Sequence, residues 1–270
     1  MKKLLAVLAA LAVAVLAFAG CGSDKQAASE TKVLKVGATA VPHAEVLEQI
    51  KDDLKAQNID LQIVEFNDYV QPNLALNDKE LDANYFQHAP YLENFIKEHP
   101  EVKVANAAGI HIEPMGIYSH KVKSLAEVKD GASVAIPNDP TNGGRALILL
   151  SKAGLIKLKD DTNIASTVQD VVENTKNLKF QELEAAQVPR AIDDVDLAVI
   201  NSNFAMQVQL NPVKDSLFIE DSTSPYVNIV AVRNGDEERP ELKALIKALQ
   251  SEKVKKFIEE KYNGAVVAAF

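Results

Sequence analysis

Val33-Leu-Lys-Val-Gly37, the segment 43–57 and Ile59-Asp-Leu-Gln-Ile-Val-Glu65 together decide the fold class. Both quoted stretches alternate apolar and polar residues, which predicts two β-strands. The segment between them predicts a helix that ends at Asn58, because its apolar residues have the spacing of one helical face: Val46, Leu47, Ile50 and Leu54. A strand, a helix and a strand in this order indicate a right-handed crossover between parallel strands, and therefore an α/β sheet.

The same order of elements starts again past the middle of the chain. Ala132–Ile136 predicts a strand, followed by a helix that begins at Asp139 or Thr141 and stops at Gly154. Two more strands are expected, at 178–183 and 195–200. We therefore expect a second α/β sheet.

The segment between the two sets, Ala107–Tyr118, reads as a strand interrupted by glycine and proline, and we place there a crossing from one lobe to the other. Near the end of the chain, Tyr226–Val232 alternates, and two helices follow it before Asn263-Gly264. These elements complete the first lobe if the chain crosses back near Asp221–Pro225. We expect lobe I at 33–112 and 226–270 and lobe II at 113–225, each with a mostly parallel sheet flanked by helices.

The first residues have the order of a bacterial export signal. Met1-Lys2-Lys3 is basic, and the apolar run that follows, Leu4–Ala19, is too short to span a bilayer comfortably. Cys21 is the only cysteine, so no disulfide within the chain is possible, and it directly follows Phe18-Ala19-Gly20. We predict a signal peptide at 1–20, lipidation of Cys21 and a polar tether at 21–32. The alternative is an ordinary signal peptide with an incidental cysteine.

Composition narrows the class of partner. The formal net charge is -9, and it becomes -11 once Lys2 and Lys3 are removed with the signal. No run of five or more basic residues is present, so nucleic acid is not an expected partner. With 47% apolar residues, the remaining chain is long enough for two lobes of roughly 100 to 150 residues each.

Aromatic residues concentrate in one short segment of a chain that is only 6% aromatic. Within Asp82–Tyr91, extended geometry places Phe86 and His88 on the same face, where they can line a slot for an apolar side chain. A thioether suits such walls. The alternative is that these aromatic residues belong to an ordinary core at the start of a helix opened by Pro90.

Three further polar residues follow expected strands. Arg145 lies one turn into the helix after Ile136, where its planar guanidinium suits a carboxylate; a surface ion pair is the alternative. The neighbouring Gly143-Gly144 lacks the lysine and hydroxyl residue of a phosphate-binding loop. Asn201 and Asn228 suit an ammonium and a carboxylate on one small molecule. The alternatives are a helix cap for Asn201 and an edge-strand position for Asn228.

Three motifs in this order resemble the NlpA family of methionine-binding lipoproteins: Asp82-Ala-Asn-Tyr-Phe-Gln-His-Ala-Pro-Tyr-Leu92, Ile136-Pro-Asn-Asp-Pro-Thr-Asn142 with Arg145-Ala-Leu147, and Asp221 to Asn228. The resemblance extends from about Val33 to the C-terminus. Phe18, at a signal position that is usually leucine, is the one departure.

The resemblance implies a type II periplasmic-binding-protein fold that holds methionine between two lobes. The implied partners are the permease and cytoplasmic ATPase subunits of an ABC importer, on the extracytoplasmic side of the cell membrane, with the lipid at Cys21 as anchor and no cofactor. Carried over by position, the resemblance implies that the ligand side chain is surrounded by Tyr69, Phe86, His88 and Tyr91. It implies that Arg145 holds the carboxylate and that Asn201 and Asn228 hold the polar end. Tyr85 and Tyr118 are further candidates.

Other functions stay open at this point. An enzyme on the same scaffold needs an activated nucleophile, and no serine lies in a Gly-x-Ser-x-Gly turn. No metal spacing such as His-Glu-x-x-His is found among the five histidines, His43, His88, His99, His111 and His120. A methionine-containing dipeptide, another small amino acid and an additional role as an adhesin are the remaining alternatives.

Overall fold

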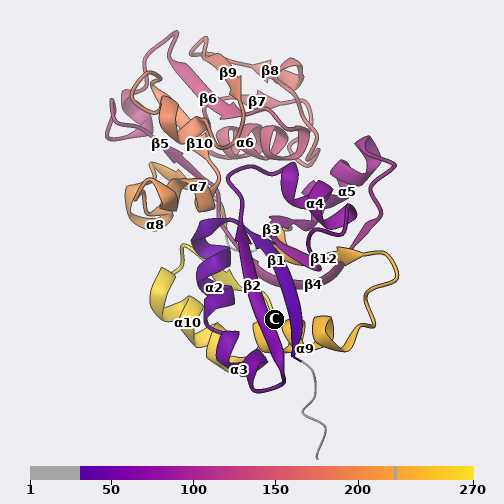
Figure 1. Cartoon of the computed structure of the whole chain (residues 1–270). Helices are drawn as coiled ribbons and strands as arrows, with labels where there is room; N and C mark the ends of the chain where they lie inside the picture. Colours follow the sequence, from indigo (N-terminus) through magenta and orange to yellow (C-terminus); the bar gives the residue numbers. More distant parts are fainter. Residues whose placement is uncertain (1–30, 222–223) are drawn as a thin grey trace, which may run out of the picture. The chain divides into compact units, whose positions relative to one another are not determined.

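The computed structural model describes residues 31–221 and 224–270, and residues 32–270 form one compact unit. The expected signal peptide and Cys21 lie outside the described residues. Within the described ranges, two larger sheets are present, together with a two-stranded one formed by β7 (Lys157–Leu158) and β8 (Val171–Glu173). Figure 1 shows the order of the elements along the chain.

The first sheet has six strands in the order β13-β4-β12-β3-β1-β2. Their bounds are β1 Lys32–Ala38, β2 Ile59–Glu65, β3 Ala83–His88, β4 Val104–Ile112, β12 Val227–Arg233 and β13 Val267–Ala268. β1 pairs in parallel with β2 and β3, whereas β12 is antiparallel to β3 and β4, and β13 is antiparallel to β4. Four of these six strands, β1 to β4, therefore run in one direction.

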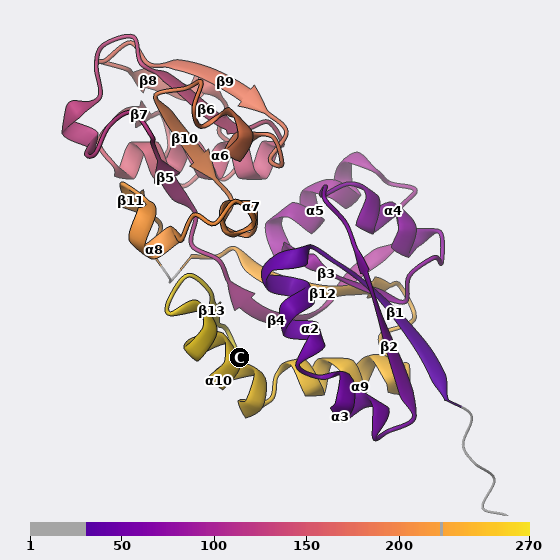
Figure 2. The ribbon, with the colours of Figure 1, turned by 60° about the vertical axis from the view of Figure 1, so that its left-hand side comes forward.

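Helices cover both faces of the six-stranded sheet (Figures 1 and 2). One face packs against α2 (Glu45–Glu48), α3 (Lys51–Lys55), α9 (Pro240–Leu249) and α10 (Glu252–Tyr262), and the other against α4 (Gln71–Asn77) and α5 (Ala89–Glu98). The alternation along the strands decides which residue faces which layer: Tyr85 belongs to the first core and Phe86 to the second.

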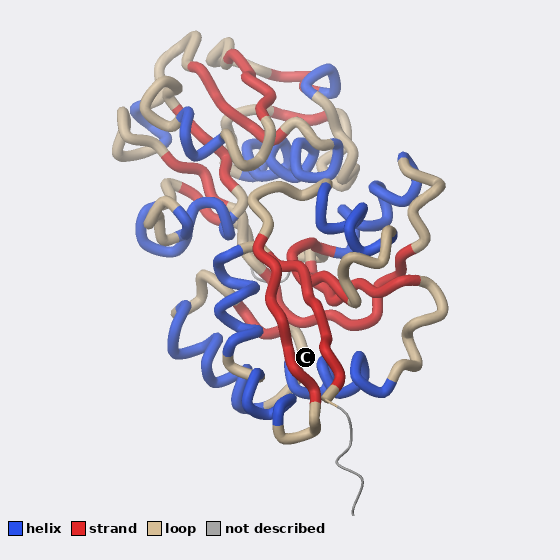
Figure 3. Tube along the Cα trace, viewed as in Figure 1, coloured by secondary structure: helices blue, strands red, loops and turns tan. Residues whose placement is uncertain are grey.

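The second sheet has five strands in the order β11-β5-β10-β6-β9. Their bounds are β5 Gly116–Tyr118, β6 Ser133–Pro137, β9 Lys179–Leu183, β10 Leu197–Ile200 and β11 Phe218–Ile219. β6 is parallel to β9 and β10, and β5 is antiparallel to β10 and β11, so four of the five strands share a direction. The α/β fold class expected from the sequence is confirmed, and Figure 3 shows strands and helices alternating in both lobes.

One face of the second sheet packs against α6 (Pro140–Lys152), and the other against α7 (Ser202–Gln207) and the turn η4 (Val188–Ala191). The shorter elements are η1 (Ala40–Ala44), η2 (Leu125–Glu127), η3 (Val168–Asp170) and α8 (Pro212–Asp215). The chain passes between the sheets at 113–115 and again between β11 and β12. The lobe boundaries, 112/113 and 225/226, stay a prediction.

Two expectations differ from the structure. The helix expected over 43–57 is divided into η1, α2 and α3, because the backbone tightens at Ile50, whose N–H donates to Leu47 O three residues back. Its apolar face is nevertheless fully buried. The edge-strand alternative for Asn228 is wrong, since β12 lies between β3 and β4.

Within 31–221 and 224–270, no helix is both long and apolar enough to cross a membrane.

Candidate functional site

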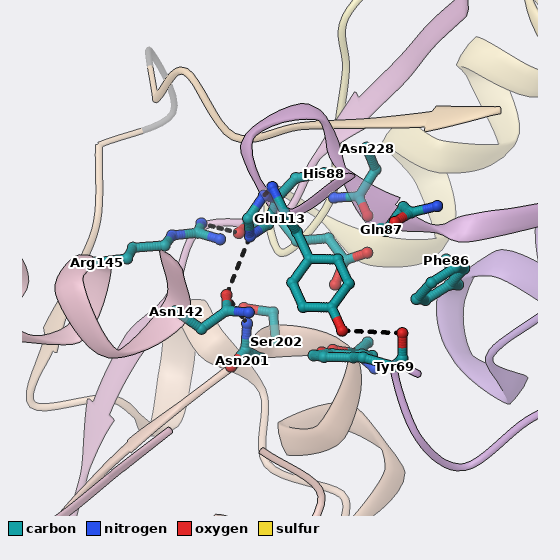
Figure 4. Close-up of a pocket in the computed structure, with 12 residues that line it drawn as sticks. Tyr69, Phe86, Gln87, His88, Glu113, Asn142, Arg145, Asn201, Ser202 and Asn228 are labelled. Carbon is teal, nitrogen blue, oxygen red and sulfur yellow. Dashed lines mark hydrogen bonds between the residues drawn. The ribbon is translucent and has the colours of Figure 1, made fainter. Parts of the chain in front are cut away.

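A pocket lies where the ends of strands from both sheets meet (Figure 4). It lies at the carboxyl ends of β3, β6 and β10, the usual place for ligands in open α/β sheets. β12 reaches it with its first residues because it runs antiparallel to β3, and its Asn228 pairs with His88. The unfilled space between its lining residues, including solvent at its mouth, is about 330 Å³.

All seven residues expected from the sequence line this pocket: Tyr69, Phe86, His88, Tyr91, Arg145, Asn201 and Asn228. Five more lining residues were not anticipated: Gln87, Glu113, Asn142, Ser202 and Asn203. Of the two further candidates, Tyr85 faces the core on the other side of β3, and Tyr118 packs in the core below the second sheet. That the seven contact a ligand stays a prediction.

The first lobe contributes an aromatic wall made of Tyr69, Phe86 and Tyr91. The ring of Tyr69 lies 6.0 Å from that of Phe86 and 5.7 Å from that of Tyr91, at tilted and edge-on angles. Tyr69 also packs 4.9 Å from Phe204 of α7 and donates its hydroxyl to Asn203 Oδ1 at 2.6 Å. This one side chain therefore joins the two lobes at the edge of the pocket.

His88 ends β3 and caps α5. Its Nδ1 accepts the backbone N–H of Tyr91 at 3.0 Å, so the proton of the neutral ring is assigned to Nε2, which donates to Asn142 Oδ1 at 3.0 Å. Burial lowers the pKa of His88 to about 3, and the charge of Arg145 adds to the effect. His88 is therefore a neutral hydrogen-bonding group that spans the two lobes.

Asn142, at the start of α6, organises the polar wall of the second lobe. Its Nδ2 donates to both carboxylate oxygens of Asp139, the N-cap of α6, which directs Oδ1 toward the pocket. There it accepts from His88 and, at 2.7 Å, from Asn201 Nδ2. Asn201 does occupy the N-cap position of α7, but it makes no side-chain cap bond, so the cap alternative does not explain its side chain.

The glycines before Arg145 are explained by close packing. A Cβ added at Gly144 would lie 2.2 Å from the carbonyl oxygen of Ile164, so α6 approaches the backbone too closely for any larger residue. The same helix then directs Arg145 inward, where the side chain is only 3% exposed. The alternative of a surface ion pair is therefore wrong: Arg145 does form an ion pair, with Glu220, but the pair is buried.

The guanidinium of Arg145 is held by groups of the protein itself. Nε donates to Glu220 at 3.1 Å, Nη2 donates to the same carboxylate and to Glu113 O at 2.7 Å, and the Tyr226 ring lies 4.2 Å away. None of these contacts uses Nη1. No sequence pattern indicated Glu220, which lies 75 residues from Arg145 along the chain.

A buried carboxylate, Glu113, borders the same end of the pocket. Burial raises its pKa, whereas the charges of His43 and Arg145 and a backbone hydrogen bond from Asn203 oppose the rise. Two buried polar atoms nearby, Asn201 Oδ1 and Asn203 Nδ2, have no hydrogen-bond partner within the described residues. Unpaired buried groups are costly, which indicates that this end of the pocket is built for a polar molecule.

Comparison with known proteins agrees with this geometry. The NlpA lipoprotein family matches residues 34–270. The chain is 44% identical over 254 residues to the D-methionine-binding lipoprotein MetQ of Escherichia coli (strain K12), covering 93% of both chains, and 42% identical over 275 residues to the methionine-binding lipoprotein MetQ of Bacillus subtilis (strain 168), covering 99% of this chain and 98% of the relative. The solved structure of a nutrient binding protein from Burkholderia cenocepacia bound to methionine has a TM-score of 0.84 and 47% identity, covering 88% of this chain and 100% of that one.

Two lobes around a half-aromatic and half-polar pocket define a substrate-binding protein of the two-lobed periplasmic class. The similarity extends over nearly the whole described chain. The chain belongs to the NlpA lipoprotein family, which confirms the resemblance seen in its sequence.

Proposed function

We propose that this protein binds methionine in the pocket and delivers it to an ABC importer. The observation that supports this most is the division of the pocket into an aromatic end and a charged end (Figure 4). Methionine is divided in the same way, with an apolar thioether chain and a zwitterionic end. The names of two relatives and the methionine in a similar structure support the same ligand.

The aromatic wall is the proposed site of the thioether. Sulfur makes favourable contacts with ring edges, and the ring of Tyr91 meets those of Tyr69 and Phe86 at edge-on angles. No charged group belongs to this wall, so an apolar side chain loses little by entering it.

The carboxylate of the ligand is assigned to Arg145, through the Nη1 that its protein contacts do not use. Glu220 then acts as the positioning group, because its bidentate contact fixes the plane of the guanidinium. Asn201 and Asn228 hold the rest of the polar end, and the unpaired Asn201 Oδ1 is available to accept from the ammonium. Glu113 supplies the negative charge that a buried ammonium needs.

Anchoring and delivery complete the proposal. The lipid at Cys21 holds the protein on the extracytoplasmic face of the cell membrane, and the closed lobes present methionine to the permease, which works with cytoplasmic ATPase subunits. We propose no catalytic activity for this pocket. Its polar groups serve to hold a charged molecule that has lost its water.

The ligand is tested by mass spectrometry of the small molecule that co-purifies with the native protein, followed by calorimetry of the emptied protein. L-methionine, D-methionine, alanine and a methionine-containing dipeptide form the panel. We expect methionine to bind and alanine to bind far more weakly. A protein that releases no amino acid and shows no heat with either methionine would contradict the proposal.

The anchor is tested separately with Cys21→Ser. We expect wild-type protein in the membrane fraction with the mass of a lipid, and the variant in the soluble fraction. A variant that stays in the membrane, beside a wild type without lipid mass, would refute the anchor while leaving methionine binding untouched.

A further inference from the structure

A second polar group, which we name the histidine cluster, consists of His43, His111 and Glu113. His111 Nε2 lies 2.7 Å from Glu113 Oε1, and His43 Nε2 lies 3.3 Å from the same oxygen. The three side chains are between 0% and 5% exposed, and their ligating atoms all lie within 4.8 Å of one another. The residues come from two distant segments, so no sequence spacing could indicate them.

The backbone holds these side chains in place. His111 is the penultimate residue of β4, and Glu113 follows two residues later, at the start of the crossing. His43 belongs to η1, which packs against the same sheet. Asn228 of β12 pairs with His111 in the ladder, and its Oδ1 lies 3.0 Å from His43 Nε2. Four possible donor atoms therefore converge from rigid elements: two imidazole nitrogens, a carboxylate oxygen and an amide oxygen.

The outer ring nitrogens are also occupied. His43 Nδ1 lies 2.7 Å from Thr39 Oγ1, and His111 Nδ1 is hydrogen-bonded to the hydroxyl of Tyr85. Hydroxyls accept as well as donate, so each ring can carry its proton on Nδ1 and leave Nε2 with a lone pair. Such outer hydrogen bonds, which fix the orientation and tautomer of an imidazole, accompany the histidine ligands of metal sites.

The charge of the cluster is unbalanced. Among the described residues, Glu113 forms ion-pair contacts only with the two histidines, and no lysine or arginine side chain pairs with its carboxylate. The charge of Arg145 acts on Glu113, but the guanidinium is paired with Glu220. Among the described residues the carboxylate therefore has no lysine or arginine partner of its own, and burying it in that state is costly.

We propose that His43, His111 and Glu113 bind a divalent transition-metal ion of the Zn²⁺ class, with Asn228 Oδ1 as the fourth donor. Imidazole and carboxylate are ligands that Zn²⁺ prefers. Donors about 2.0–2.2 Å from a tetrahedral ion lie about 3.3–3.6 Å apart, so the His43–Glu113 separation already fits, and the His111–Glu113 contact must open by less than about 1 Å. The inference does not rest on the proposed ligand of the pocket.

The ion would share two residues with the pocket, since Glu113 and Asn228 line both. A bound ion takes the negative charge of Glu113, which the ammonium of an amino acid would otherwise use. Zn²⁺ should therefore weaken methionine binding, and methionine should weaken Zn²⁺ binding by the same factor, as linkage requires. His111 is absent from the lining of the pocket, which separates the two activities.

The test uses the full chain, purified in detergent and freed of metal and amino acid, with Zn²⁺ titrated against a chromophoric chelator. We expect one ion per protein, with a dissociation constant in the micromolar range or below, and at least a tenfold loss of affinity in His111→Gln and in Glu113→Gln. The matched control is His99→Ala with His120→Ala. Both histidines are exposed beside carboxylates, where adventitious binding would occur.

Loss of the site in the surface double variant, or its survival in both cluster variants, overturns the proposal. His111→Gln should keep the circular dichroism spectrum of the wild type, which shows that it folds, and Zn²⁺ should raise the melting temperature of the wild type but not of this variant. If His111→Gln does not fold, the proposal is tested by the Zn²⁺ affinity of Glu113→Gln and by the visible spectrum of Co²⁺ bound to the wild type. A Co²⁺ spectrum that matches the aqueous ion would overturn the proposal.

Discussion

The two walls of the pocket are built on different physical principles. The first lobe presents rings that contact one another at 5.7 to 6.3 Å and continue into its apolar core, whereas the second lobe presents amides and a guanidinium fixed by directional bonds. An aromatic wall tolerates small shifts because dispersion varies gently with position. A polar wall does not tolerate such shifts, since the strength of each hydrogen bond depends on the distance and angle between its donor and acceptor.

This difference teaches where affinity and selectivity arise. Loss of one partner from the polar wall leaves a buried group unpaired, so its effects on binding should be large for every amino acid. Loss of a ring from the aromatic wall removes only contacts with the side chain, so its effects should be smaller and should depend on which amino acid is bound. Tyr69 and His88, which contact both lobes, should report on closure instead.

The largest effect is expected for Arg145→Ala. A charge-assisted pair left half-made costs about 2–5 kcal/mol, which corresponds to a loss of methionine affinity of about 30-fold to several thousandfold. Calorimetry measures the loss, and circular dichroism checks the fold, because the change also leaves Glu220 unpaired. Glu220→Gln is the matched control and should lose less than Arg145→Ala. Binding within threefold of wild type by a folded Arg145→Ala would place the carboxylate elsewhere.

Phe86→Ala should act on selectivity. A sulfur–aromatic contact is worth about 0.3–1.5 kcal/mol, so methionine affinity should fall by up to about 10-fold while alanine affinity changes by less than about twofold. Phe95→Ala is the matched control, because Phe95 belongs to the same apolar core without lining the pocket. Equal losses for methionine and alanine would show that Phe86 does not form the side-chain wall.

The sequence indicated the two walls because clusters of polar and aromatic residues follow the predicted strands. The carboxyl ends of parallel strands lie at the same edge of a sheet, so these clusters were expected to meet there. It could not indicate which groups pair across that edge. His88 meets Asn142 at a separation of 54 residues and His43 meets Asn228 at 185, and such pairings depend on strand order and register.

Glu113 was missed for a related reason. It lies in the crossing between sheets, which the sequence presented only as an interrupted strand, and its surroundings depend on where the distant His43 folds. The break at Ile50 was missed because apolar spacing predicts which face of a helix is buried and not whether its axis is continuous.

Tyr69→Phe tests how firmly the two walls are joined. It removes the 2.6 Å hydrogen bond to Asn203 and keeps the ring, so methionine affinity should fall about fivefold, in line with about 1 kcal/mol for one bond. Small-angle scattering with methionine should show a larger open fraction in the variant. Tyr91→Phe is the control, since its hydroxyl bonds to Tyr69 O within the same lobe. A control that loses as much as Tyr69→Phe would refute a specific role in closure.

The smallest effect is expected from pH and concerns His88, the other residue that joins the walls. Its pKa is about 3 in the closed pocket, against 6.5 for a free ring, so the open state binds more protons and acid favours opening. If the ring has its ordinary pKa when the lobes open, methionine affinity is constant above about pH 7, falls about threefold between pH 7 and 6, and continues to fall toward pH 3. The physical cause is burial, which disfavours the charged ring, and the charge of Arg145 adds to it. His88→Gln keeps both hydrogen bonds without a titrating group, so calorimetry at pH 7.0, 6.5 and 6.0 should show a flatter profile than wild type. Identical slopes in the two proteins would mean that His88 does not couple protonation to closure.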